Sequence, residues 1–86
     1  MNVDNQITLM CAVRYALGRK TYAVSCVSNV LIDCWDALNK SNKERIVEEI
    51  KEAIKKEEAG MECDVRNWQR ILLLNDADQK RRKKWK

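Results

Sequence analysis

Basic and aromatic residues gather in one short stretch, residues 14–22, which reads Arg-Tyr-Ala-Leu-Gly-Arg-Lys-Thr-Tyr. Arginine offers a planar fork of hydrogen-bond donors and tyrosine offers rigid amphipathic area, so both are common where binding energy concentrates. The same pair suits a nucleotide, with the ring on a base and the guanidinium on a phosphate. We therefore predict a partner-binding corner formed by Arg14, Tyr15, Arg19, Lys20 and Tyr22. The alternative is that both tyrosines pack between helices while the cations are solvated near a helix C-terminus.

The C-terminal end of the chain is strongly basic. The last twelve residues hold six basic and two acidic side chains, which accounts for the whole net charge of +4. Cations with a tryptophan among them suit a phosphate backbone with stacked bases, through contacts that ignore sequence and weaken with salt. The nucleic-acid-binding residues of this alternative site are Lys80, Arg81, Arg82, Lys83, Lys84, Trp85 and Lys86. A solubilising or artificial end of the chain is the competing interpretation.

Residues for catalysis or metal binding are few. The chain has no histidine, and its four cysteines form no C-x-x-C pair, so we expect no metal site, no cofactor and no enzymatic activity. Asp33 and Asp36 fall on the outer side of a predicted helix, where carboxylates are ordinarily solvated. We predict that the cysteines are buried free thiols that act as small hydrophobic side chains.

Length and composition favour one small intracellular domain. Its 86 residues are too few for two domains, and the N-terminal residues lack the basic and apolar regions of a signal peptide. The longest apolar run, Ile71–Leu74, is far too short to span a membrane. With two glycines and no proline, the chain favours helices with short connections. A domain this small often gains stability from self-association.

Hydrophobic periodicity predicts four helices, over residues 6–17, 22–38, 42–59 and 65–74. Expected N-caps are Asp4 or Asn5, Thr21, Ser41 (in a capping box with Glu44) and Asp64, and Gly18 and Gly60 are expected to end the first and third helices. The expected buried positions are Ile7, Met10, Cys11, Val13 and Leu17, then Val24, Val27, Leu31, Cys34, Trp35 and Leu38, then Ile46, Val47, Ile50, Ala53 and Ile54, then Val65, Trp68, Ile71 and Leu72.

These elements predict an all-α fold, a compact bundle of about four short helices with a basic C-terminal tail. The helical domain is expected to cover residues 1–75. The tail, residues 76–86, is expected to be exposed or to extend the last helix in a frayed form.

Residues 7–72 resemble a group of small phage and prophage proteins of Gram-positive bacteria whose activity is not established. The resemblance rests on the run Arg14–Arg19 followed by Thr21-Tyr22, on Trp35-Asp36, on the Glu/Ile/Lys-rich third helix, and on Ala59–Asp64 leading into Trp68. It implies an origin rather than a mechanism, and it does not include the basic tail.

Taken with this resemblance, the residues predict a non-enzymatic binding protein of phage type that acts in the cytoplasm of a bacterial host. It would block a host protein or ribonucleoprotein, for example a CRISPR-type defence effector, through the Arg14–Tyr22 corner. The alternatives are a non-specific nucleic-acid-binding accessory protein that uses the basic tail, or a small-nucleotide sponge that uses the corner. Homo-oligomers are compatible with each of these functions.

Overall fold

The computed structural model describes residues 2–17 and 22–84, except for the side chains of Tyr22 and of residues 82–84. Every regular element in this part of the chain is helical. The helices are α1 (Val3–Leu17), α2 (Tyr22–Cys34), α3 (Lys40–Lys55) and α4 (Glu62–Lys84), and a short 3-10 helix, η1 (Trp35–Ala37), follows α2. The predicted all-α fold is confirmed.

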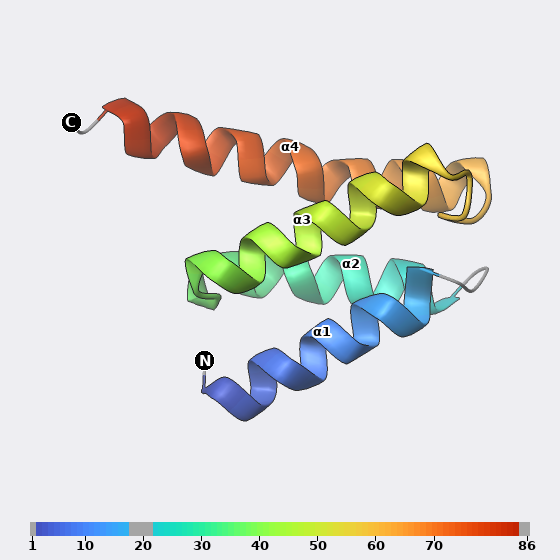
Figure 1. Ribbon diagram of the computed structural model, residues 1–86, viewed down its shortest axis with the longest axis horizontal. Helices are drawn as coiled ribbons and strands as arrows, with labels where there is room; N and C mark the ends of the chain where they lie inside the picture. Colours follow the sequence, from blue (N-terminus) through green and yellow to red (C-terminus); the bar gives the residue numbers. More distant parts are fainter. Residues whose placement is uncertain (1, 18–21, 85–86) are drawn as a thin grey trace.

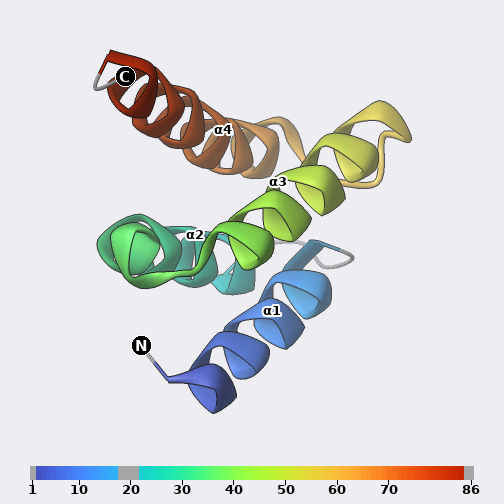
Figure 2. The same ribbon diagram turned by 60° about the vertical axis from the view of Figure 1, so that its left-hand side comes forward.

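Successive helices run in opposite directions and are joined by short connections (Figure 1). The helix pair α2 and α3 forms the middle of the bundle, because each of the two packs against both α1 and α4. In Figures 1 and 2, α1 and α4 accordingly lie on opposite sides of the molecule. One long side of α1 therefore faces away from the rest of the bundle.

The core lies where the inner faces of the helices meet. Trp35 and Trp68 are its largest side chains, with 1% and 0% of their surface exposed. The residues predicted to be buried in α3, in α4 and between residues 24 and 38 are all buried or packed against the core. Burial of each large apolar side chain contributes about 1.5–3 kcal/mol, so these three segments supply most of the hydrophobic stabilisation.

Asn39 caps α3, and not Ser41 as the sequence predicted. The Asn39 side chain accepts a hydrogen bond from the Asn42 backbone N–H at 2.9 Å, while the Ser41 hydroxyl donates to the same Asn39 oxygen at 3.0 Å. A capping box at Ser41 does not form, because α3 begins at Lys40 and Ser41 therefore lies inside the helix. Asparagine and serine are almost equally good caps, so the spacing of the buried residues leaves either choice open.

A buried glutamine ties the start of α1 to the start of α3. α1 begins at Val3, earlier than predicted, and the Asn2 side chain accepts from the Asn5 N–H at 2.8 Å in the manner of an N-cap. One turn into the helix, Gln6 Oε1 accepts from Asn42 Nδ2 at 2.6 Å and from the Asn39 N–H at 3.1 Å. Because Gln6 is 5% exposed, these bonds satisfy a polar group that burial would otherwise destabilise.

α3 ends at Lys55, before the predicted end at residue 59, in a Schellman motif. The Glu58 N–H donates to the Ala53 carbonyl at 2.8 Å, and the Glu57 N–H donates to the Ile54 carbonyl at 3.1 Å. Glu57 therefore takes a left-handed conformation, with φ at 60°, at a position that usually carries glycine. Gly60 lies further along, in the connection to α4, and does not end α3.

α4 begins at Glu62, and Asp64 lies inside its first turn rather than before it. Asp64 Oδ2 accepts from the Met61 N–H at 3.0 Å, which is the reciprocal half of a capping box. Gly60 has φ at 100°, and a Cβ on it would meet Asp64 Oδ2 at 2.5 Å. Glycine is thus required here both by the backbone conformation and by the space.

Candidate functional site

The structure describes only part of the predicted binding corner. Arg14 and Tyr15 lie in the last turn of α1, and Tyr22 is the first residue of α2. Arg19, Lys20 and the Tyr22 side chain lie outside the described part of the molecule. The site that can be built from contacts and exposure is therefore centred on α1.

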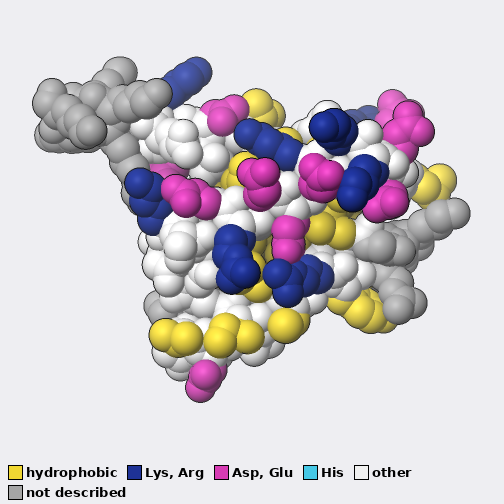
Figure 3. Space-filling model, in the orientation of Figure 1, with side chains coloured by type: hydrophobic (Ala, Val, Ile, Leu, Met, Phe, Trp, Pro, Cys, Tyr) yellow, Lys and Arg dark blue, Asp and Glu magenta, His cyan; other side chains and the backbone are white. Residues whose placement is uncertain are grey.

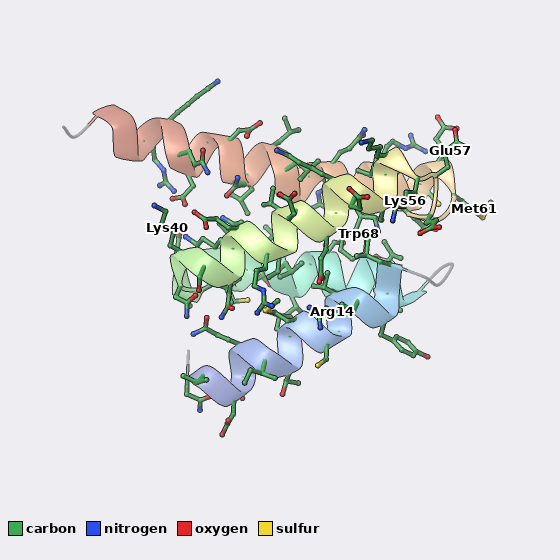
Figure 4. The ribbon with its side chains drawn as sticks, in the orientation of Figure 1. Arg14, Lys40, Lys56, Glu57, Met61 and Trp68 are labelled. Atoms are coloured by element: carbon green, nitrogen blue, oxygen red, sulfur yellow. The ribbon has the colours of Figure 1, made fainter. Side chains whose placement is uncertain are left out.

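Arg14 is already engaged by the bundle. Its Nε donates to Glu49 Oε1 on α3 at 2.7 Å, and this hydrogen bond, together with the nearby charge, raises the pKa of Arg14. Figure 4 shows Arg14 between α1 and α3. The Arg14 side chain nevertheless remains 56% exposed, so part of it is accessible to a partner.

An open groove of about 330 Å³ lies beside this ion pair between α1 and α3. It is lined by Arg14, Leu17, Glu49, Glu52, Ala53, Lys56 and Glu58. Its two cations are both paired, since Lys56 also lies 3.4 Å from Glu52. Three carboxylates around the groove would repel a phosphate, so its electrostatics do not favour a nucleotide.

Arg14 and Tyr15 point in different directions. Consecutive helical residues are about 100° apart around the axis, so Arg14 turns toward α3 and Tyr15 turns away from it. The Tyr15 side chain is 60% exposed. The two residues therefore do not converge on one point, and Tyr15 belongs to another surface of α1.

That surface is a row of apolar side chains along α1, which we call the outer face of α1. It consists of Val3, Ile7, Cys11 and Tyr15, which recur every fourth residue. Val3 is 67% exposed and Ile7 is 55% exposed, and Cys11 is exposed as well. Hydrophobic side chains form a row along this edge of the molecule in Figure 3. The prediction that Ile7 and Cys11 are core residues is therefore wrong.

The error has a physical cause in the composition of α1. This helix buries a first set of residues, Gln6, Leu9, Met10, Val13, Ala16 and Leu17, and exposes the outer face as a second apolar set. Its charged residues are only Asp4 and Arg14. A helix that is apolar on two sides gives no clear amphipathic pattern, so periodicity cannot separate the buried side from the exposed one.

The basic C-terminal residues continue α4 as a helix. The sequence pattern was expected to end near Leu74, but α4 runs to Lys84, and Asn75 and Asp78 carry its buried stripe onward with 8% and 7% exposure. Figure 1 shows the C-terminal turns of α4 extending past the other helices. Arg82, Lys83 and Lys84 lie in these turns, although their side chains are not described, and Trp85 and Lys86 lie outside the described residues.

A buried ion pair holds this end of α4 against α3. Lys43 Nζ lies 3.2 Å from Asp78 Oδ2, and the two side chains are only 5% and 10% exposed. The Lys43 ammonium also lies 5.8 Å from the centre of the Trp35 ring. Exposed Arg81 lies 3.3 Å from Asp78 and 3.8 Å from Asp36 of η1. Of the two described basic residues here, Lys80 and Arg81, Arg81 is thus partly committed to contacts within the chain.

The cysteines differ from the prediction. Cys11, Cys26 and Cys63 are exposed rather than buried, and only Cys34 is partly buried. All four are free thiols, and burial raises the pKa of Cys34, which favours its protonated form. Among the described residues no group of histidine, cysteine and carboxylate side chains has the arrangement of a metal site.

Comparisons of the chain with protein-family models, with curated proteins and with solved structures find no match. Within the described ranges, no helix combines the length and the apolar character that crossing a membrane requires. The functional inference therefore rests on the surface chemistry of this chain.

Proposed function

We propose that the chain is a non-enzymatic binding protein that recognises a protein partner through the outer face of α1, with Arg14 and the adjoining corner at one end of that face. The single observation that carries the proposal is the row of exposed apolar side chains from Val3 to Tyr15. Exposed apolar residues are ordinary when scattered, but a continuous row along one helix is typical of an interaction surface.

The chemistry of this face suits protein recognition. Removal of apolar surface from water contributes about 25 cal/mol for each Å², and no charged side chain within the row has to be desolvated. Tyr15 adds a residue type that often dominates interface energetics. The exposed part of the Arg14 side chain can offer charge-assisted hydrogen bonds at the margin, and its Nε bond to Glu49 already orients the guanidinium.

For the partner we propose a host protein or ribonucleoprotein of the bacterial cytoplasm, with interference as the outcome and CRISPR-type effectors as one example. The support is the resemblance of residues 7–72 to small phage and prophage proteins. The chain would act by occupying a surface of the target.

Substitutions on matched exposed positions test this proposal. In a Gram-positive host challenged with phage, Ile7→Glu and Tyr15→Ala should abolish interference with the defence system. Val30→Glu on α2 and Leu73→Glu on α4 alter side chains that are 51% and 68% exposed and should leave interference unchanged. Equal activity of all four variants, each confirmed to be folded by circular dichroism, would rule out the outer face of α1 as the binding site.

A second candidate function is non-specific nucleic-acid binding by the C-terminal turns of α4. The observation that favours it is the extension of these basic turns beyond the bundle (Figure 1). Replacement of Arg82, Lys83 and Lys84 by glutamine should then remove a salt-sensitive affinity for DNA and RNA, because each lost phosphate contact lowers the salt dependence. If labelled DNA and RNA do not bind the unaltered chain even at low salt, this candidate is excluded.

A further inference from the structure

One side of α4 carries a row of exposed residues that runs along most of the helix. The row, which we call the outer row of α4, consists of Arg66, Arg70, Leu73, Ala77 and Lys80, all of which are exposed. Their alternate spacing of four and three residues keeps them within about 80° of one another around the helix axis. From its first to its last member the row is about 21 Å long, and all of its charged members are cations.

The three cations of the outer row have no carboxylate partner within the described part of the chain. Arg66 and Lys80 form no hydrogen bond or ion pair there. Arg70 donates only to neutral oxygens, Oδ1 of Asn29 on α2 and Oδ1 of Asn67, both at 3.4 Å. The fold therefore does not neutralise these charges, and they are accessible to an anion from outside the chain.

The acidic residues of α4 lie off this row. Asp64 and Asp78 are turned inward and are only 3% and 7% exposed. Glu62 precedes the row in the first turn of the helix, and Asp76 lies beside the row, about 80° from Arg66 around the axis. From its first to its last cation, the row is interrupted by uncharged residues only.

The turns that follow continue the basic character of this edge. The α4 backbone stays helical to Lys84, past Asp78, the last buried residue that the structure describes. These turns extend past the other helices, and α4 lies at the edge of the bundle opposite α1 (Figures 1 and 2). The outer row and the C-terminal turns together therefore form one rigid basic edge that a large ligand can reach.

The spacing of the cations suits a polyanion with two parallel backbones. Arg66 and Arg70 form one group, and Lys80 begins a second group about 15 Å further along the axis. The uncharged Leu73 and Ala77 lie between the two groups. The major groove of B-DNA is about 12 Å wide, with a phosphate backbone on either side. A helix that lies across this groove can thus bring one group of cations to each backbone.

The same edge is less suited to single strands. Proteins that bind single-stranded nucleic acid combine cations with exposed aromatic rings on which the bases stack. The only aromatic residue of α4 is Trp68, which is 0% exposed and belongs to the core. Phosphate contacts alone are therefore the chemistry that the outer row offers.

We propose that the outer row of α4 binds the phosphate backbones of duplex DNA, with Arg66 and Arg70 on one backbone and Lys80 with the C-terminal turns on the other. The inference rests on the second candidate function and extends its surface from the C-terminal turns to the body of the bundle. Recognition is independent of base sequence, because Leu73 and Ala77 have no side-chain group that hydrogen-bonds a base edge. DNA and a protein partner on α1 can be bound at the same time, since the two surfaces lie on opposite sides of the molecule.

Titration of a labelled DNA duplex at several salt concentrations, followed by fluorescence anisotropy, tests the outer row. Arg66→Gln with Arg70→Gln should weaken binding by at least about tenfold and lower the slope of log K against log salt by about 2, because each phosphate contact contributes about 0.9. Lys51→Gln with Lys55→Gln removes two exposed cations with the same spacing from α3 and should change neither quantity. An unchanged affinity and slope in the arginine double variant would overturn the proposal.

Substitutions between and beside the cations give a second, independent measurement. Leu73→Glu places a carboxylate between the two backbones and should weaken DNA binding much more than Leu73→Gln, which has a similar shape and no charge. Asp76→Asn removes a carboxylate beside the row and should strengthen binding by about two- to threefold. Circular dichroism confirms that each variant is folded. Equal binding by the two Leu73 variants would overturn the placement of the row on DNA.

The choice of nucleic acid and of variant separates this inference from the functions proposed above. Duplex RNA, whose major groove is deep and narrow, and single strands should bind more weakly than duplex DNA at the same salt. A preference for single strands would overturn the duplex assignment. If replacement of Arg82, Lys83 and Lys84 removes DNA binding while the arginine double variant binds normally, the outer row is excluded and the second candidate function stands. If the unaltered chain binds no DNA even at low salt, both are excluded, and the interference assay still decides the role of α1.

Discussion

Helices α1 and α3 lie side by side and have almost the same length, but the side chains on their solvent-facing sides differ in polarity. α3 buries Ile46, Val47, Ile50 and Ala53 and covers its opposite side with glutamate and lysine. α1 buries a similar set and leaves Val3, Ile7, Cys11 and Tyr15 exposed on its opposite side. The outer side of α3 is charged and well solvated, whereas the outer face of α1 leaves apolar surface exposed to water.

The ends and partners of the two helices follow this difference. α3 has an asparagine cap, a Schellman motif and a buried ion pair to α4, so its structure is fully determined within the chain. α1 touches α3 through Gln6 and the exposed Arg14–Glu49 pair. Helices α2, α3 and α4 form the frame of the bundle, and the proposed binding surface lies on α1.

The largest effect on stability is expected at the buried ion pair of the frame. Asp78→Ala leaves the Lys43 ammonium buried with no carboxylate in contact and should lower the free energy of unfolding by about 3 kcal/mol, measured by urea titration of tryptophan fluorescence. Replacing the pair with Lys43→Met and Asp78→Leu should recover most of this loss. A loss below about 1 kcal/mol in Asp78→Ala would contradict the assignment of Asp78 to the frame.

The stability losses of two isoleucine-to-alanine substitutions, one on each helix, compare α1 and α3 directly. Ile50→Ala on α3 should cost about 3 kcal/mol, because Ile50 is 0% exposed and the substitution leaves a cavity. Ile7→Ala should change the stability of the monomer by less than about 0.5 kcal/mol, as for other surface positions. Urea titrations of both variants give the two changes in the free energy of unfolding. Equal losses would show that Ile7 is a core residue.

The start of α3 gives a smaller effect. Asn39→Ala should cost about 1 kcal/mol, because the Asn42 N–H loses its acceptor and Ser41 loses its contact with the same oxygen. Ser41→Ala is the matched control, with a loss of only a few tenths of a kcal/mol expected. A larger loss in Ser41→Ala than in Asn39→Ala would instead support Ser41 as the N-cap, as the sequence predicted.

The end of α3 gives the smallest effect, and it has the opposite sign. Glu57→Gly should raise the stability by about 0.5–1 kcal/mol, because glycine adopts the left-handed conformation of the Schellman motif without steric cost. Lys56→Gly, one residue earlier and with φ at −86°, should instead destabilise the protein. The thermal midpoints of the two variants should therefore move in opposite directions.

The fold could be read from the sequence wherever a helix separates polar from apolar residues. The buried sets of α3 and of residues 24–38 were predicted correctly, because each forms a single stripe. The pattern failed in α4 after Leu74, because Asn75 and Asp78 continue the buried stripe with polar side chains. The burial of Lys43 was not predicted either, because lysine is polar and its partner Asp78 is distant in the sequence.

The candidate site was only partly predictable. The residue types of the corner pointed to Arg14 and Tyr15. Which of the two faces the bundle depends on the position of α3, which periodicity does not give. Ile7 and Cys11 were assigned to the core because an apolar residue in a short helix is usually buried. One signal was present in the sequence: α1 has only two charged residues, and that is few for a helix with a solvated side.

The most direct test of the outer face uses two thiols that the chain already has. Cys11 on the outer face of α1 and Cys26 on α2 are both exposed, so N-ethylmaleimide should alkylate both in dilute protein. Rates measured by short labelling pulses and peptide mass spectrometry should change for only one of them. When target is added, Cys11 should become protected and Cys26 should not. Equal rates for Cys11 under all these conditions would contradict the claim that this face binds protein.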